Sequence, residues 1–372
     1  MKKFLRGFLT LFMGVALSLN VSVSNTYAYD VPSTIRIGLE YKYKDVLTVP
    51  ISNKKIEFGY NAEDNFISLA EFSSESGFTM NVSYKNYFKM LDKFNSFEDA
   101  KRVAENFKNY GYTAFPVYIG NEDWNVYINS ENKNLENLGY NFEQITASKD
   151  YVELRVDNVP VFGADNGEKP QFKAIDKGKV MLLGDRSYRG AIEFGRYTQG
   201  KMTAVNVIDF DEYLYGVVPS EMPSSWEMEA LKAQAVTART YAISKIGTHN
   251  ESGYDLCDGV NCQVYNGYGN EAGRTNEAID ETSGIMIYYN DEPINAVFSA
   301  SSGGYTDNSE NVWTLSLPYL RAVIDNNEYE PVEWTRTITT SQLNSLVSAH
   351  GKNIGAATDI VISKVSELAR VQ

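Results

Sequence analysis

The sequence of 372 residues is poor in the side chains that supply most metal and nucleophilic chemistry. It has two cysteines, Cys257 and Cys262, and two histidines, His249 and His350. A zinc peptidase or zinc amidase needs about three nitrogen, oxygen or sulfur ligands with supporting residues around them, usually with more than one well-placed histidine. The scarcity disfavours that class. A peptidase with Cys257 as nucleophile and His249 as base is also disfavoured, because nothing around the cysteine indicates an activated thiolate.

Basic residues are outnumbered as well, with 34 Lys and Arg against 48 Asp and Glu and a net charge of -14. Binding to nucleic acid draws most of its affinity from clustered Lys and Arg that release counterions from phosphates. The charge balance therefore predicts no nucleic-acid partner.

Long apolar runs are absent after the N-terminus. Residues 8–19 are apolar, follow Lys2, Lys3 and Arg6, and precede small and polar residues that end at Ala28. This order predicts a secretory signal over residues 1–28 with cleavage after Ala28, and so a secreted protein. The run is shorter than the roughly 20 residues that span a bilayer, so an anchor through residues 8–19 is the less favoured interpretation.

The rest of the chain is long enough for about two domains. Residues 31–60 alternate short apolar runs with charge and predict N-terminal strands, for which membership of the main domain is one interpretation. Further on, Ser96-Phe-Glu-Asp99 predicts a helix start, and Gly111 stands where the helix would be capped. Two strand-like runs around a turn at Gly120-Asn121 then predict a hairpin.

Residues 75–145 resemble the sporulation-related repeat (SPOR) fold, a small peptidoglycan-binding module. The resemblance rests on Ser96-Phe-Glu-Asp-Ala-Lys-Arg-Val-Ala and Tyr110-Gly-Tyr-Thr-Ala-Phe-Pro-Val-Tyr. The alternative is an ordinary α+β insertion, because residues 129–140 represent the expected second helix poorly.

Strand-like runs continue from Tyr151 to Phe210 and lead into a long motif from Asp211 to Ala242. Within it, Glu221 lies in a Glu-Met-Pro turn, Ser224-Ser-Trp-Glu227 is predicted to be a capping box, and an apolar stripe follows. The pattern predicts a central helix at about residues 225–246, with Glu221 immediately before its N-terminus.

This motif resembles the hallmark of the sporulation stage II protein D / LytB amidase-enhancer family (the SpoIID/LytB domain). Asp255-Leu-Cys257 to Cys262-Gln263-Val-Tyr265 and Phe298-Ser-Ala-Ser-Ser-Gly-Gly304 extend the resemblance, which covers residues 151–372. Residues 35–39 are interpreted as a detached first strand of the same domain. We therefore expect an α+β fold with a mostly antiparallel sheet, a central helix and a small inserted module. Relatives generally continue beyond the position of Gln372, so the domain is expected to be truncated there.

The stage II protein D branch implies a function in the walls of Gram-positive cells. There the residue that matches Glu221 is the key group of a lytic transglycosylase, which cuts between N-acetylmuramic acid and N-acetylglucosamine without water. Such a reaction suits one carboxylate as general acid and then base, giving 1,6-anhydro ends, whereas hydrolytic glycosidases generally need two. The alternative for Glu221 is a capping carboxylate at a helix entrance.

The amidase-enhancer branch implies a different role, that of a non-enzymatic protein that binds wall glycan and stimulates a cell-wall amidase. The expected partners are peptidoglycan glycan strands in both cases, and an amidase by resemblance. Six further positions in the motifs are candidates for a sugar-binding cleft: Gln263, Tyr265, Ser301, Ser302, Tyr305 and Arg239. The alternatives for Arg239 are that it orients Glu221 or that it simply packs and pairs.

Some members of the family bind zinc through two cysteines and a histidine that precedes the second cysteine. Here that position is Asn261, so we expect no cofactor. In an exported protein, a disulfide between Cys257 and Cys262 is the favoured state. His249 and Asp258 remain weak candidates for a metal site with the two cysteines.

Overall fold

The computed structural model of the protein describes residues 31–62, 65–129, 135, 139–176, 178–198, 200–326, 335–352, 355 and 360–365. The expected secretory signal, residues 1–28, lies outside these ranges. Within them, no helix combines the length and the apolar character needed to cross a membrane.

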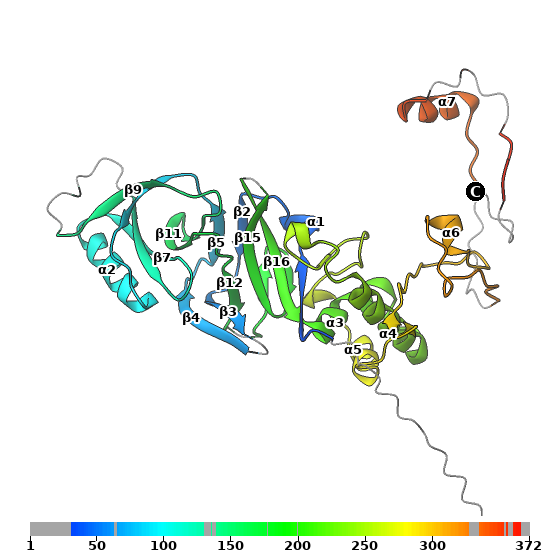
Figure 1. Cartoon of the computed structure of the whole chain (residues 1–372), viewed down its shortest axis with the longest axis horizontal. Coiled ribbons are helices and arrows are strands. Elements are labelled where there is room, and N and C mark those ends of the chain that lie inside the picture. Colours follow the sequence, from blue (N-terminus) through cyan, green and yellow to red (C-terminus); the bar gives the residue numbers. More distant parts are fainter. Residues whose placement is uncertain are drawn as a thin grey trace, which may run out of the picture.

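A seven-stranded sheet forms the centre of the molecule (Figure 1). Its order is β17-β1-β16-β15-β12-β3-β4, and all neighbours are antiparallel except β1 and β17. The first strand thus lies between two strands from the C-terminal half. The members are β1 (Thr34–Gly38), β3 (Lys55–Ala62), β4 (Asn65–Ser73), β12 (Gln171–Ala174), β15 (Ala191–Thr198), β16 (Lys201–Asp209) and β17 (Leu256–Cys257).

The second sheet has eight strands in the order β2-β5-β10-β11-β7-β8-β6-β9, with one parallel pair, β7 and β11. It takes strands from both sides of residues 75–145, so the resemblance to the SPOR fold covers part of a larger sheet. Its members are β2 (Thr48–Ile51), β5 (Phe78–Val82), β6 (Asn86–Met90), β7 (Thr113–Tyr118), β8 (Trp124–Asn129), β9 (Phe142–Thr146), β10 (Val152–Val156) and β11 (Val159–Ala164).

Helix α2 (Phe97–Asn109) packs its apolar side against the second sheet. The Ser96 hydroxyl accepts a hydrogen bond from the Asp99 N–H at 3.2 Å, and Gly111 follows the helix with a positive φ of 79°. The predicted helix start and end are therefore confirmed, as is the hairpin of β7 and β8.

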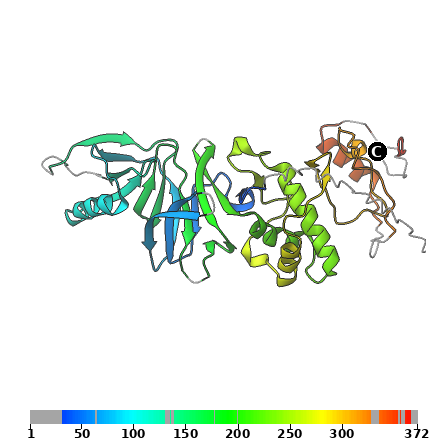
Figure 2. The ribbon, with the colours of Figure 1, turned by 60° about the horizontal axis from the view of Figure 1, so that its bottom comes forward.

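Three helices lie beyond the β1 and β17 edge of the central sheet (Figures 1 and 2). They are α3 (Phe210–Glu221), α4 (Met228–Lys245) and α5 (Gly273–Glu281). The later segment, with α6 (Ser309–Val312) and α7 (Thr340–Ala349), projects away from them. Short elements complete the described chain: α1 (Glu40–Tyr43), β13 (Met181–Leu183), β14 (Arg186–Tyr188), η1 (Asn250–Ser252), η2 (Tyr268–Asn270), β18 (Tyr288–Tyr289) and β19 (Glu292–Pro293).

The predicted α+β class is confirmed, and the predicted central helix corresponds to α4. Two details differ. Helix α4 begins at Met228, and the residue at its N-cap, Glu227, makes no side-chain cap hydrogen bond. The predicted capping box is wrong because Pro223 and Trp226 close a turn, with the Trp226 N–H donating to the Pro223 carbonyl at 3.1 Å.

Aromatic side chains join the two sheets into one core. Phe58 on β3 and Phe172 on β12 meet Phe162 on β11, with ring centroids 4.7 and 5.7 Å from that of Phe162. Trp124 on β8 lies 6.0 Å from the same ring. Aromatic pairs at these distances add stabilisation beyond the area that they bury.

Because Phe162 touches both sheets and is completely buried, Phe162→Ala should lower the free energy of unfolding by about 3–5 kcal/mol. Urea unfolding followed by tryptophan fluorescence measures the change. Leu47→Ala is the control, since Leu47 is 55% exposed and its loss should cost less than about 0.5 kcal/mol. Equal effects of the two substitutions would contradict the shared core.

Candidate functional site

Glu221 is the last residue of α3 and is half-buried. The Val264 N–H donates a hydrogen bond to its Oε1 at 2.7 Å. Among the described residues no other hydrogen bond or ion pair reaches this carboxylate. One carboxylate oxygen is therefore fixed by the backbone, and Oε2 remains available to a ligand.

Helix α3 brings Glu221 to this position. The Asp209 carboxylate caps its start by accepting hydrogen bonds from the N–H groups of Asp211 and Glu212 at 2.9 and 3.1 Å. The helix contains Pro219 and ends at Glu221, after which Met222 is extended. Glu221 thus lies at the C-terminal end of a helix, and α4 begins only after an intervening turn, which corrects the expected position directly before a helix N-terminus.

Two asparagines that the sequence analysis did not single out lie beside Glu221. Asn266 and Asn270 both donate to the Ser220 hydroxyl oxygen, at 3.0 and 2.9 Å. They hold the loop after β17 against the end of α3. The signal that could have found them is the run Asn266-Gly-Tyr-Gly-Asn270, which directly follows the Cys-Gln-Val-Tyr motif.

Arg189, which lies two residues before β15 of the central sheet, fixes the same loop. Its guanidinium donates to both carboxylate oxygens of Glu271, at 2.6 and 2.9 Å, and lies 4.9 Å from the centre of the Tyr268 ring. Hydrogen bonding to Glu271 raises the pKa of Arg189, whereas burial raises the pKa of the nearby Glu212 carboxyl. A bidentate pair of this kind is geometrically specific, so it orients the loop that carries Asn270.

The structure buries Gln263 and Tyr265, each 1% exposed, so neither side chain is accessible to a glycan. The Gln263 amide donates to the Ala238 carbonyl at 3.3 Å, and the Tyr265 hydroxyl donates to Asn206 Oδ1 at 2.8 Å. Burial raises the pKa of Tyr265 well above its usual value. Because Val264 lies between these two anchored residues, they position the N–H that binds Glu221.

Arg239 is also buried, at 1% exposed, and its hydrogen bonds are internal. Its guanidinium donates to the carbonyls of Thr282 and Ile279, at 2.8 and 3.1 Å, and to Asp211 Oδ1 at 3.1 Å. These contacts join α4 to the end of α5 and the start of α3. Of the two roles expected for Arg239, the structure shows packing and pairing.

Ser301, Ser302 and Tyr305 lie in the segment after β19, apart from α3 in Figure 1. The Ser302 hydroxyl donates to Asp325 Oδ2 at 2.9 Å, and Tyr305 forms a β-bridge with Ile324. The Ser301 oxygen accepts from the N–H of Gly303 at 3.2 Å. These contacts fold the segment on itself, and a role of the three residues in sugar binding stays a prediction.

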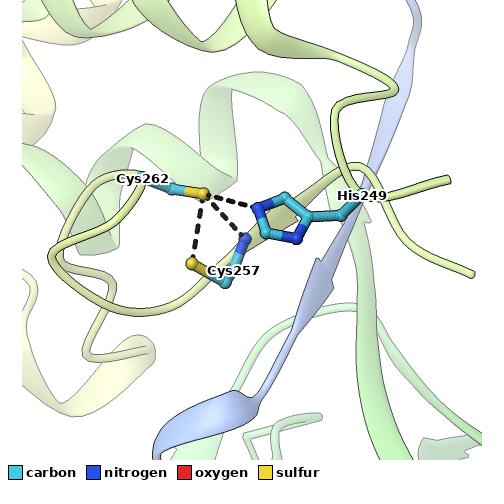
Figure 3. A group of neighbouring side chains, drawn as sticks. All are labelled: His249, Cys257 and Cys262. Carbon is cyan, nitrogen blue, oxygen red and sulfur yellow. Dashed lines mark hydrogen bonds between the residues drawn. The ribbon is translucent and has the colours of Figure 1, made fainter. Parts of the chain in front are cut away.

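His249, Cys257 and Cys262 form a compact group (Figure 3). His249 Nε2 lies 3.2 Å from Cys262 Sγ, the two sulfurs are 3.1 Å apart, and all three donor atoms lie within 4.8 Å of one another. A disulfide requires sulfurs about 2.05 Å apart. Both cysteines are free, so the structure lacks the expected disulfide and turns the sulfurs toward a third donor instead.

The group fits a zinc ion in its donor chemistry. Two thiolates and an imidazole nitrogen supply three of the four positions of a tetrahedral site. The hydrogen bond between the two thiols lowers the pKa of Cys257 to about 7 and raises that of Cys262, so it favours a thiolate at one of the two cysteines. Asp258 takes no part, because its carboxylate accepts the Tyr41 N–H at 3.0 Å and lies 3.9 Å from Arg186.

Known proteins match this part of the chain. The family model described as "SpoIID: Stage II sporulation protein" matches residues 198–289, which hold Glu221, the three helices and the group of His249, Cys257 and Cys262. Residues 198–289 therefore form a SpoIID domain, and the resemblance of this part of the chain to the family of stage II sporulation protein D and the amidase enhancer is confirmed.

Two curated relatives come from Bacillus subtilis (strain 168). The chain is 38% identical over 194 residues to its "Amidase enhancer", covering 52% of this chain and 26% of the relative. It is 36% identical over 170 residues to its "Stage II sporulation protein D", covering 42% and 47%. An "Uncharacterized protein" of Brachyspira hyodysenteriae is 35% identical over 198 residues, covering 50% and 53%. The chain therefore spans between about a quarter and about half of the length of these relatives.

The three donors predict that the protein, purified in reducing buffer with zinc and then dialysed, retains about one zinc ion per chain. His249→Ala should lower the zinc affinity by on the order of a hundredfold or more, because two thiolates alone hold zinc weakly. His350→Ala is the control, since His350 is exposed at the end of α7.

Elemental analysis gives the zinc content, and titration of free thiols in denaturant gives the state of the cysteines. Loss of zinc from both variants alike, or the absence of free thiols in protein prepared under reducing conditions, would contradict the metal site.

Proposed function

We propose that the protein is a peptidoglycan lytic transglycosylase of cell-wall remodelling or sporulation, with Glu221 as the catalytic residue. One observation carries the proposal: Glu221 lies within the family domain, with Oε1 bound to the Val264 N–H and Oε2 open to a ligand. The glycosidic bond between N-acetylmuramic acid and N-acetylglucosamine would be its substrate.

The reaction needs one group that first gives and then takes a proton. Protonated Glu221 donates its proton to the glycosidic oxygen as the bond from that oxygen to C1 of the muramic acid breaks. The 6-hydroxyl of the same sugar then attacks C1, and the Glu221 carboxylate accepts its proton. The products are a free 4-hydroxyl and a 1,6-anhydro end, and no water is consumed, so a second carboxylate to activate water is unnecessary.

The surroundings of Glu221 offer groups that suit a sugar chain. Trp226 in the turn after α3 and Tyr268 in η2 are 47% and 42% exposed, and their flat apolar faces can stack on pyranose rings. Asn266 and Asn270 each donate one hydrogen bond to Ser220, and the rest of each side-chain amide can bind hydroxyl and acetamido groups of the glycan. In this proposal the two aromatic residues and the two asparagines bind the glycan, and His249, Cys257 and Cys262, which would hold a zinc ion, steady the loop that carries Val264.

The identity to the amidase enhancer favours a second candidate, an exported protein that binds wall glycan and stimulates a cell-wall amidase without cleaving the glycan. In that case Glu221 would act only through its hydrogen bond to Val264, as a fixed point for the loop between β17 and α5.

Glu221→Gln separates the two candidates. The amide keeps the shape of the side chain and an oxygen that can accept the Val264 N–H, but it cannot donate and accept the reaction proton. Glycan strands with and without stem peptides, digested and analysed by mass spectrometry, should yield 1,6-anhydro products with the wild type. The rate should fall by about 10²–10⁴ in the variant.

Glu227→Gln is the matched control, because Glu227 is an exposed carboxylate six residues away that makes no cap hydrogen bond, and it should leave the rate unchanged. If the wild type forms no anhydro ends, while it stimulates an amidase as well as Glu221→Gln does, the enhancer role replaces the transglycosylase.

A further inference from the structure

A pocket with a volume of about 500 Å³ opens where the two sheets meet, outside residues 198–289 that match the family. It is formed by β3, the end of β7, the turn between β7 and β8, and the segment before β12. The described lining residues that bear a charge or an aromatic hydroxyl group are Tyr60, Tyr118, Glu122, Glu168 and Lys169.

Glu168 is the distinctive side chain of this pocket. It is half-buried, and its Oε1 packs so closely on Gly120 that a Cβ at this glycine would lie 2.4 Å from it. Among the described residues, no hydrogen bond or ion pair reaches the carboxylate, and burial alone raises its pKa. A carboxylate partly removed from water without a partner costs some free energy, which a cationic ligand would recover.

The other lining groups fit a cation as well. Glu122 supplies a second carboxylate, which accepts the Tyr60 hydroxyl at 3.1 Å. Tyr60 and Tyr118 also line the pocket, and aromatic rings attract a positive charge. Lys169 does not neutralise Glu168, because its Nζ lies over the Tyr197 ring, 4.6 Å from the ring centre.

We propose that this pocket binds a primary ammonium group, with Glu168 as its main charge partner and Glu122 and the two tyrosines around it. An anion would meet two carboxylates, and a neutral sugar would leave the Glu168 charge uncompensated. A metal ion is a poorer fit, because Ca²⁺ takes six to eight oxygen ligands and the pocket offers mainly two carboxylates and aromatic rings.

The assignment of this ammonium group to a cell-wall component rests on the proposed function. Two wall components carry primary amines: glucosamine that has lost its acetyl group in the glycan, and the side chain of the diamino acid in a stem peptide. Their shared chemistry is an ammonium group on a polymer. Binding it at the junction of the sheets would add a second contact to the one at Glu221 and raise the total affinity for the polymer.

Titration calorimetry at low salt tests the pocket with four probes. The probes are a glucosamine tetramer, its fully N-acetylated form, a stem tetrapeptide with a free diamino acid amine, and the same peptide with that amine acetylated. The wild type should bind one or both amine probes at least tenfold more tightly than the acetylated counterparts. The probe that binds identifies the source of the amine.

Glu168→Gln should weaken the binding of that amine probe by at least tenfold, and Gly120→Ala should weaken it too, because the added Cβ displaces the carboxylate. Glu105→Gln, on the exposed side of α2, is the control and should bind like the wild type. Thermal unfolding measured in parallel shows whether each variant is folded. If Gly120→Ala is misfolded, Glu168→Gln alone tests the proposal.

Failure of this proposal and failure of the proposed function give different results. Glu221→Gln should still bind the amine probe, and Glu168→Gln should still release anhydro ends from N-acetylated strands if Glu221 is catalytic. The pocket proposal is overturned if the wild type binds no amine probe, if acetylated probes bind equally well, or if Glu168→Gln binds like the wild type.

Discussion

Strand β1 is the segment on which the central sheet depends. Its five residues pair on one side with β16, about 170 residues later, and its last two pair on the other side with β17, about 220 residues later. Ile35 and Ile37 are completely buried, and on the opposite face the Arg36 guanidinium donates to both carboxylate oxygens of Glu193 at 2.8 Å. Without β1, β16 would have an unpaired edge and β17 would lose its only described strand partner.

The same strand sets the position of the group of His249, Cys257 and Cys262 and, through the loop that follows, of the N–H that meets Glu221. Gly38 pairs with Cys257, and its carbonyl accepts the Asp258 N–H at 3.1 Å. The chain then turns through Cys262 to Gln263, Val264 and Tyr265, where the Val264 N–H meets the carboxylate of Glu221. The residues matched by the family model begin at 198, so the sheet that supports their site is completed from outside them.

Features encoded by neighbouring residues were predictable from the sequence. The Ser96 cap, Gly111 and the Gly120-Asn121 turn are local, and the structure has them. Helix α3 could not be predicted because Gly216 and Pro219 interrupt the helical pattern, although the Met222 N–H closes its last turn on the Val218 carbonyl. Alternating apolar residues indicate a strand but not its partner, which is why β10 and β11 could not be assigned to the second sheet.

The candidate site, too, was only partly predictable from the sequence. The motif around Glu221 is long enough to identify, but polar residues within it do not reveal whether they face solvent or the interior. Gln263 and Tyr265 donate hydrogen bonds to the Ala238 carbonyl and to Asn206 inside the core instead of lining a cleft. The spacing of Cys257 and Cys262 suits either a disulfide or a metal, and His249, which decides between them, reaches the cysteines only through the fold.

Arg239 has a consequence for the way this region opens. The Arg239 guanidinium on α4 donates hydrogen bonds to carbonyls at the end of α5 and to the Asp211 carboxylate at the start of α3. It thus links the three helices. Separating any of the three helices would leave that charge buried without its partners, which is costly. The helices should therefore unfold as one cooperative unit, and their protected amides should exchange hydrogen with solvent through a common opening event.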